Sequence, residues 1–152
     1  LFMAYHGYNK VFGKGGLSGT TGWFGSMGWK YPAVQAKVAA ATEIGAGLMV
    51  AAGFLTPLAC AGLIGLMLVA IITVHWKVGF FIFLPNGGWE YCATIALCAL
   101  GVASIGAGEW SVDHALDLDV TDWKGLLIAF VVGVGGALLQ LALFFKPART
   151  TS

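Results

Sequence analysis

The longest apolar stretch of the chain runs from Glu43 to His75 and holds no charged residue between these two ends. As a single helix it would reach roughly 45 Å, which exceeds the hydrocarbon core of a bilayer at about 30 Å. Thr56-Pro57 interrupts the stretch, and the residue before a proline is disfavoured in the α conformation. The pattern therefore predicts two membrane helices joined by a tight turn, which returns Glu43 and His75 to the same side of the bilayer.

Shorter apolar segments on either side of this stretch predict three more helices. The five helices are expected over about 1–12, 34–55, 57–76, 89–106 and 124–145. The segment 13–32 is rich in glycine and in interfacial aromatic residues, which predicts an irregular connection or a short helix lying on the membrane surface. Because the chain opens inside the apolar run LFMAY, we expect the first helix to begin upstream of Leu1.

Composition makes lipid the expected solvent. Hydrophobic residues make up 59% of the chain, charged residues make up 10%, and the mean hydropathy is +0.85. A soluble domain carries about 25% charged residues, so a chain this apolar is not expected to fold around one water-soluble core. The net charge of +1 and the lack of a basic run give no support for a nucleic-acid partner.

The charged residues are divided between the two ends of the predicted bundle. Seven of the eight lysines and arginines fall on the side where the first helix ends: Lys10, Lys14, Lys30, Lys37, Lys77, Lys146 and Arg149. Lys124 falls on the opposite side, together with most of the acidic residues. Cytoplasmic loops carry an excess of basic residues, so the sequence predicts a multi-pass membrane protein with a cytoplasmic C-terminus.

Small residues recur at four-residue spacing within the predicted helices. Lipid provides no hydrophobic drive for helix association, so small residues are favoured where two helices touch. Residues that lie four apart share a helical face. The sequence therefore predicts helix contacts at Ala41 and Gly45, at Ala61 and Gly65, and at Ala129, Gly133 and Ala137.

Four ionisable residues fall at a common depth near the predicted cytoplasmic side. They are His6, Glu43, His75 and Glu90, which belong to four different helices, and Lys10 and Tyr91 lie close to them in the sequence. Ionisable groups inside a membrane are costly and mark a functional site by default. We therefore expect these six residues to form a polar pocket.

Three interpretations of this pocket stay open. In the first, Glu43 pairs with a histidine or with Lys10 and locks the bundle. In the second, histidine and carboxylate groups bind a quinone or a similar redox ligand and move its proton, while aromatic residues pack on its ring. In the third, His6, Glu43, His75 and Glu90 hold a transition metal ion through imidazole and carboxylate ligands.

An ordered set of short motifs resembles a known family. The motifs are HGYNKVFGKGG, EIGAGLMVAAGFLTPLA, MLVAIITVH, GFF followed by GGWEY, and GAGEWSVD. In order and spacing, over residues 1–116, they resemble the DoxX family of small bacterial membrane proteins. The last motif departs from the family's usual G-P-G-R-x-S-x-D, because Ala107 and Glu109 replace its proline and its arginine.

The resemblance implies an all-α polytopic membrane bundle in the bacterial plasma membrane, with a DoxX-like four-helix core over residues 1–116. Residues 117–152 then add the end of the acidic outer segment, a fifth transmembrane helix and a cytoplasmic tail. The resemblance also implies a subunit of an oxidoreductase complex, since relatives include the membrane subunit of thiosulfate:quinone oxidoreductase.

These implications set the expected ligands and partners. We expect a quinone or a transition metal ion as cofactor. We expect the lipid bilayer and other membrane subunits as partners, with the subunits docking through the helix Lys124–Phe145. A non-catalytic accessory subunit that stabilises a larger membrane complex is the alternative function.

Overall fold

The computed structural model describes residues 1–147, and within them the chain is built from helices. In chain order these are α1 (Phe2–Phe12), α2 (Gly16–Met27), α3 (Pro32–Ala52), α4 (Thr56–Ala70), the π-helical turn η1 (Ile71–His75), α5 (Glu90–Ile105), α6 (Val112–Ala115) and α7 (Asp122–Phe144). Apart from one isolated bridge between Trp29 and Phe145, the described residues hold no β-structure. The predicted all-α class is confirmed, while Arg149 lies outside the described residues.

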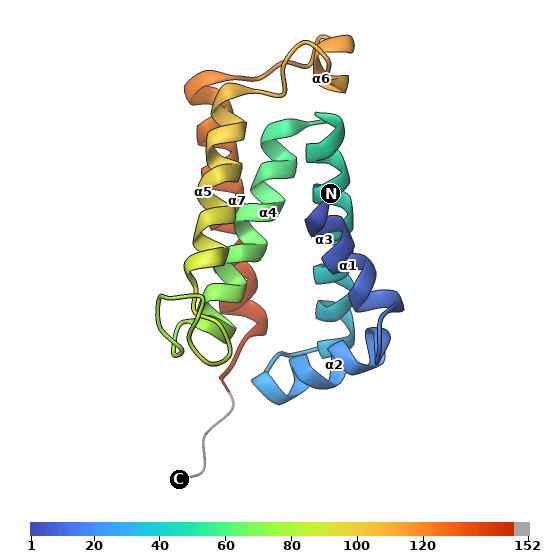
Figure 1. The fold of residues 1–152 in the computed structure, drawn as a ribbon, viewed down its shortest axis with the longest axis vertical. Coiled ribbons are helices and arrows are strands. Elements are labelled where there is room, and N and C mark those ends of the chain that lie inside the picture. The colour runs from blue at the N-terminus through green and yellow to red at the C-terminus, as the bar shows by residue number, and fades with distance from the viewer. Residues whose placement is uncertain (148–152) are drawn as a thin grey trace.

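The long apolar stretch divides at the predicted position. α3 ends at Ala52, and α4 begins at Thr56 with a proline in its first turn. Gly53, with a φ of 62°, and Leu55, with a φ of 44°, both adopt the left-handed conformation and reverse the chain within a few residues. A Cβ at Gly53 would meet the Cβ of Ser111 at 2.5 Å, so glycine is required there for space as well as for φ. α3 and α4 therefore pack side by side (Figure 1).

α4 is the centre of the bundle. It packs against α3, α5 and α7, and its contact with α7 is the most extensive of the three (Figure 1). A Cβ added at Gly65 would lie 3.0 Å from the carbonyl oxygen of Gly133, and a Cβ at Gly133 would lie 2.8 Å from that of Ala61. Small residues thus let the two backbones approach closely. The predicted contacts at Ala61 and Gly65, and at Ala129, Gly133 and Ala137, are confirmed.

α1 packs along α3 through a different face from the predicted one. Gly7 of α1 faces the carbonyl oxygen of Ala40, which leaves only 2.7 Å for an added Cβ. The expected contact at Ala41 and Gly45 is wrong, because Ala41 is exposed and nothing lies within 4 Å of a Cβ built at Gly45. Small residues occur on several faces of this helix, so four-residue spacing alone does not identify the buried face.

The segment 13–32 contains a helix and is not the irregular connection that was one of the two expectations. Residues Gly16–Met27 form α2, which lies across one end of the bundle and packs on α1 and α3 (Figure 1). Gly15 and Gly28 flank this helix with φ of 92° and 99°, so the glycines that need left-handed angles lie at its ends. None of its residues is fully buried, as expected of the surface-lying helix that was the alternative prediction.

Two helical segments of residues 1–147 are long and apolar enough to cross a membrane. They are Thr56–His75, formed by α4 and η1, and Asp122–Phe144, which is α7. The helix Glu90–Ile105 is apolar but shorter. α3 is long enough, but Gln35, Lys37 and Glu43 lower its mean hydropathy. Fewer helices therefore meet this criterion than the five that the apolar pattern predicts.

The charged loops gather at opposite ends of the bundle. The links that carry Lys14, Lys30 and Lys77, and the segment with Lys146 that follows α7, lie at the end crossed by α2 (Figure 1). The α3–α4 turn and the acidic segment around α6 lie at the other end (Figure 1). The separation of charge along the sequence is therefore also a separation in space.

Candidate functional site

The buried charge on α3 is paired. Glu43 lies on the inner face of α3 with 6% of its side chain exposed, and the Nζ of Lys10 from α1 lies 2.5 and 2.6 Å from its two carboxylate oxygens. The close approach of α1 at Gly7 brings the two helices near enough for this pair. A buried charge without a partner carries a large desolvation cost, so the pair holds α1 against α3. Such a contact is what the structural-lock interpretation requires.

His75 and Glu90 support the loop that joins η1 to α5. The Nδ1 atom of His75 lies 2.8 Å from the carbonyl oxygen of Gly87. Glu90 accepts a hydrogen bond from the backbone N–H of Ile82 at 3.0 Å. Both side chains are therefore engaged with loop backbone rather than directed toward Glu43.

The four residues predicted as metal ligands are not assembled. Within the described chain, no group of three or more His, Cys, Asp or Glu side chains could hold a metal ion. His6 is exposed and borders a polar pocket at the α1–α2 corner, and Tyr91 is exposed beside a separate apolar groove. The metal interpretation of His6, Glu43, His75 and Glu90 is therefore wrong for this structure. Equal depth defines a position along the bundle axis, but the position around the axis depends on the rotation of each helix.

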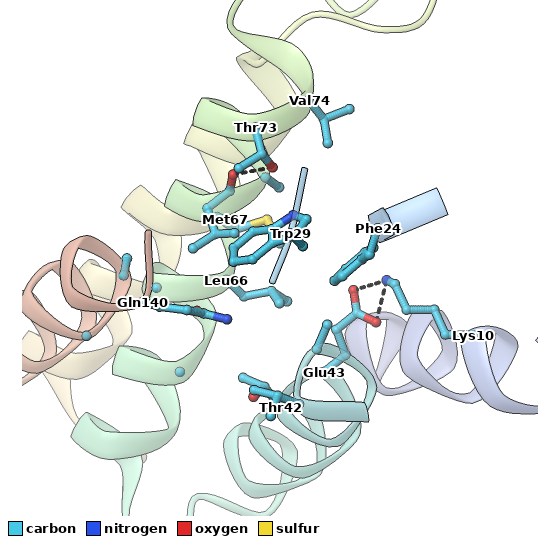
Figure 2. Close-up of a pocket in the computed structure, with 18 of the residues that line it drawn as sticks. Lys10, Phe24, Trp29, Thr42, Glu43, Leu66, Met67, Thr73, Val74 and Gln140 are labelled. Carbon is cyan, nitrogen blue, oxygen red and sulfur yellow. Dashed lines mark hydrogen bonds and ion pairs between the residues drawn. The ribbon is translucent and has the colours of Figure 1, made fainter. Parts of the chain in front are cut away.

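A third, mainly apolar pocket lies between the two halves of the bundle, and we call it the central pocket. It has a volume of about 310 Å³; α1, α2 and α3 line one side, and α4, η1 and α7 line the other (Figure 2). Its lining includes the small residues Gly62 and Gly136 and the large side chains of Leu66, Met67 and Phe24. Of the six predicted site residues, Lys10 and Glu43 line this pocket.

Four polar side chains in the wall of the central pocket are engaged with other protein groups. Lys10 and Glu43 pair with each other (Figure 2). Gln140 of α7 donates a hydrogen bond from Nε2 to the Oε1 of Gln35 at 2.8 Å. The hydroxyl of Thr73, in the π-helical turn, donates to the backbone carbonyl four residues earlier at 2.8 Å. These contacts leave a pocket with mainly apolar walls and a few fixed polar groups, which is typical of small-molecule sites.

Trp29 is a buried polar residue of the pocket that lacks a hydrogen-bond partner, whereas Thr42, which also lines the pocket, is only partly buried. Trp29 is 5% exposed, and its indole Nε1 has no hydrogen-bond partner among residues 1–147. Its ring centroid lies 5.9 Å from that of Phe24 and 5.1 Å from that of Phe145. In the view of Figure 2 the ring lies between Phe24 on one side and the Leu66 and Met67 side chains on the other. A buried N–H that makes no hydrogen bond costs about 1–3 kcal/mol, so this donor calls for an explanation.

The backbone around Trp29 is tied to the end of α7. Lys30 donates its backbone N–H to the carbonyl of Phe144 at 2.8 Å, and Lys146 donates to that of Gly28 at 3.1 Å. The Nζ of Lys30 also donates to the carbonyl of Leu143 at 3.0 Å. The α2–α3 link is therefore joined to α7 across one end of the central pocket. Sequence reasoning placed Trp29 only among interfacial aromatic residues, because the sequence carries no local signal for this long-range pairing.

The acidic segment contributes a buried carboxylate to the opposite end of the bundle. Asp113 is 2% exposed and accepts hydrogen bonds from the backbone N–H groups of Leu55 and Thr56, at 2.6 and 2.8 Å, and from the Thr56 hydroxyl at 2.6 Å. It thus caps the N-terminus of α4 from a distant segment, where free N–H groups and the helix dipole favour an anion. Ser111 caps α6 by accepting the N–H of His114 at 3.1 Å.

The acidic segment after Asp113 is exposed over residues 114–119. The Nδ1 atom of exposed His114 lies 2.8 Å from a carboxylate oxygen of Asp119, and this hydrogen bond, together with the negative charge of Asp119, raises the pKa of His114 above its ordinary value. An ion pair this exposed contributes little to stability. We therefore assign no functional chemistry to this pair.

Comparison with known proteins connects these features to a family. A family model described as DoxX matches residues 1–76, which is half of the chain and runs from α1 through η1. The matched residues include Lys10, Trp29 and Glu43. No curated protein and no solved structure matches the chain significantly.

Proposed function

The chain belongs to the DoxX family, and from this premise we propose that it is an integral membrane subunit of a redox-linked complex that binds a quinone. The proposed site is the central pocket rather than the four-residue cluster expected from the sequence. The resemblance of the motifs to redox-associated relatives supports the first part of the proposal. The geometry of the pocket supports the second part.

The observation that carries the quinone assignment is an apolar cavity with a charged pair in its wall. The volume of about 310 Å³ lies at the lower end of the range of about 300–1,000 Å³ for ligand pockets. A quinone is a flat ring that is apolar except for its carbonyl oxygens, so it needs apolar walls and few polar contacts. Phe24 and Trp29 provide aromatic surfaces against which such a ring can pack.

Lys10 and Glu43 supply the proton chemistry in this proposal. The ammonium group of Lys10 is a hydrogen-bond donor for a carbonyl oxygen, and the adjacent carboxylate of Glu43 is a proton acceptor. Conversion of a quinone to a quinol takes up two electrons and two protons. In this proposal Lys10 gives one proton to a carbonyl oxygen, Glu43 gives the second after accepting it from water, and a partner subunit supplies the electrons. The pair therefore both locks α1 against α3 and borders the ligand.

The membrane setting completes the proposal. We place α1, α3, α4 with η1, α5 and α7 across a bacterial plasma membrane, with α2 on the cytoplasmic surface and the C-terminus in the cytoplasm. The gathering of Lys14, Lys30, Lys77 and Lys146 at one end supports this orientation. We further propose that the family core extends over residues 1–116, as the motifs indicate, and that α7 is added to it.

Two neighbouring glycines of α7 provide a matched test of the quinone site. Gly136 lines the central pocket and Gly135 does not, and nothing lies within 4 Å of a Cβ built at either position. Gly136→Leu should place a side chain in the pocket and weaken binding of a benzoquinone with a decyl tail about tenfold or more. Gly135→Leu changes helix propensity equally and should leave the affinity unchanged.

The measurement is quenching of tryptophan fluorescence by the decyl-tailed quinone, with the purified chain in lipid nanodiscs. Saturable quenching that Gly136→Leu weakens and Gly135→Leu preserves would support the site. Equal affinity in the two variants would move the site elsewhere, and the lack of saturable binding in the unsubstituted chain would refute the quinone proposal.

A second proposal, a non-catalytic accessory subunit, is favoured by one observation. Lys10 and Glu43 satisfy each other directly, as a structural lock requires. In this proposal, partner subunits dock on the outer face of α7, where Phe130, Val131 and Leu139 are half exposed or more. Partner co-purification that is lost on polar substitution of this face, combined with no saturable quinone binding, would favour the accessory role over the first proposal.

A further inference from the structure

We propose that Trp29 is a ligand-binding residue of the central pocket, whose indole N–H donates a hydrogen bond to a carbonyl oxygen of the bound molecule. The inference rests on the proposed quinone function and deepens it, because it names the group that orients the ring. The shared chemistry of the ligand is an apolar molecule that carries a carbonyl acceptor. We assign this acceptor to the quinone rather than to the acyl ester of a lipid.

The first step of the inference is the state of the donor. Tryptophan carries only a donor at Nε1, and this atom is buried and lacks a hydrogen-bond partner among residues 1–147. The large majority of buried side-chain polar atoms in folded proteins are hydrogen-bonded, so each exception needs a cause. Trp29 lines the central pocket, so a ligand that carries an acceptor and reaches the indole N–H would supply the missing partner.

The second step is that the indole is held in position. Hydrogen bonds of the flanking residues Lys30 and Gly28 join its backbone to the end of α7. The rings of Phe24 and Phe145 pack against its side chain. A donor fixed in this way loses little conformational freedom when it binds an acceptor, which is the condition for a preorganised contact.

The third step is the contrast with four other polar side chains of the wall; Thr42 also lines the pocket, but it is only partly buried. Gln140 is bonded to Gln35, and the Thr73 hydroxyl is bonded to its own helix. Lys10 and Glu43 are bonded to each other. A ligand that brings a carbonyl acceptor therefore satisfies Trp29 without breaking an existing contact. The Lys10–Glu43 pair, on α1 and α3, offers a second polar contact away from Trp29, which suits a ring with carbonyl groups on opposite sides.

The experiment follows the indole N–H directly. The chain is labelled with ¹⁵N at the tryptophan indoles, placed in nanodiscs and titrated with the decyl-tailed benzoquinone, and Trp29→Phe assigns the resonance by removing it. We expect the Trp29 resonance to shift saturably with the quinone and to respond far less to decylbenzene, which lacks the carbonyl. Trp29→Phe should weaken quinone affinity about tenfold, whereas Trp76→Phe, outside the pocket, should not.

A parallel titration separates the two sources of the carbonyl. Nanodiscs of ester-linked phospholipid are compared with nanodiscs of ether-linked phospholipid, which lack acyl carbonyls. We expect the Trp29 resonance to be the same in both before the quinone is added. A resonance that differs between the two lipids and ignores the quinone would assign the site to a lipid ester and overturn the inference.

The outcomes distinguish this inference from the function on which it rests. If the unsubstituted chain does not bind the quinone, the proposed function fails. If the quinone binds but neither shifts the Trp29 resonance nor loses affinity in Trp29→Phe, the inference fails and the proposed function stands. If Trp29→Phe folds poorly, Trp→Phe replacements of the other five tryptophans assign the Trp29 resonance by elimination, so the test remains decisive.

Discussion

At the scale of single residues, the carboxylate of Asp113 stabilises the α3–α4 turn through contacts that the local sequence of the turn does not predict. Leu55 adopts a φ of 44°, a conformation that costs a residue with a Cβ roughly 1–2 kcal/mol. Asp113 accepts its N–H and caps α4 at the same time. The motif GAGEWSVD that resembles the family's ending therefore has a physical role here, because its Ser111 caps α6 and its Asp113 fastens α6 to the α3–α4 turn.

We predict that Asp113→Asn lowers the free energy of unfolding by about 2–3 kcal/mol, because charge-assisted hydrogen bonds are lost and an NH₂ group faces an N–H donor. For a chain of this size the melting temperature should fall by roughly 5–10 °C. The measurement is thermal unfolding in detergent followed by circular dichroism. Asp117→Asn, at an exposed residue of the same segment, is the control and should melt like the unsubstituted chain. Equal melting of the two variants would show that the cap is not stabilising.

The same scale explains what could be predicted about the candidate site. Glu43 stands out in the sequence because it is a charge within an apolar helix, and the structure buries and pairs it. Trp29 does not stand out, because aromatic residues are common in interfacial links. Its burial depends on the pairing of Lys30 and Lys146 with the other segment, which no local pattern encodes.

At the scale of elements, α7 is a structural wall as well as an exposed surface. Its inner face, with Gly125, Ala129, Gly133 and Ala137, is buried, mainly against α4, while its outer face carries large exposed apolar side chains. Removing α7 would therefore uncover α4 and open the central pocket. A docking role for this helix has to be tested on the outer face, since a deletion of Lys124–Ser152 would also disturb the bundle.

We predict that Gly133→Leu destabilises the bundle by about 3 kcal/mol or more, because its Cβ would lie 2.8 Å from the Ala61 carbonyl oxygen and 3.0 Å from the Cβ of Ile64. Gly135→Leu, on the open side of the same helix, should be neutral or slightly stabilising because leucine is the better helix former. Thermal unfolding in detergent compares the two. A Gly133→Leu chain that melts no lower than Gly135→Leu would contradict the close packing of α4 and α7.

At the scale of the whole molecule, helix positions could be predicted, but their rotation could not. The positions of α1, α3, α4, α5 and α7 follow from local apolar runs, and the break before Pro57 follows from the backbone limits that proline imposes. Which face of each helix is buried depends on its neighbours, so the contact expected at Gly45 was wrong while the one at Gly133 was confirmed. The predicted His and Glu cluster failed for the same reason, because depth was known and rotation was not.

Orientation in the membrane is the remaining property of the whole molecule that the charge pattern predicts. The end with α2 carries Lys14, and the end with α6 lies near Glu109, and both residues are exposed. Because basic loops stay in the cytoplasm, a membrane-impermeant maleimide applied to intact bacterial spheroplasts should label Glu109→Cys but not Lys14→Cys. The native cysteines are first replaced, since one of the three, Cys98, is exposed.

Permeabilising the spheroplasts should then expose Lys14→Cys to the same reagent and show that its thiol is reactive. Labelling of Lys14→Cys in intact spheroplasts, with Glu109→Cys protected, would invert the proposed topology and place α2 outside. Labelling of both from outside would mean that the two ends do not lie on opposite sides of the membrane. Labelling of Glu109→Cys without labelling of Lys14→Cys agrees with lysine-rich loops that remain in the cytoplasm. This result would place α2 on the cytoplasmic side, together with the loop around Trp29 that joins α2 to α3.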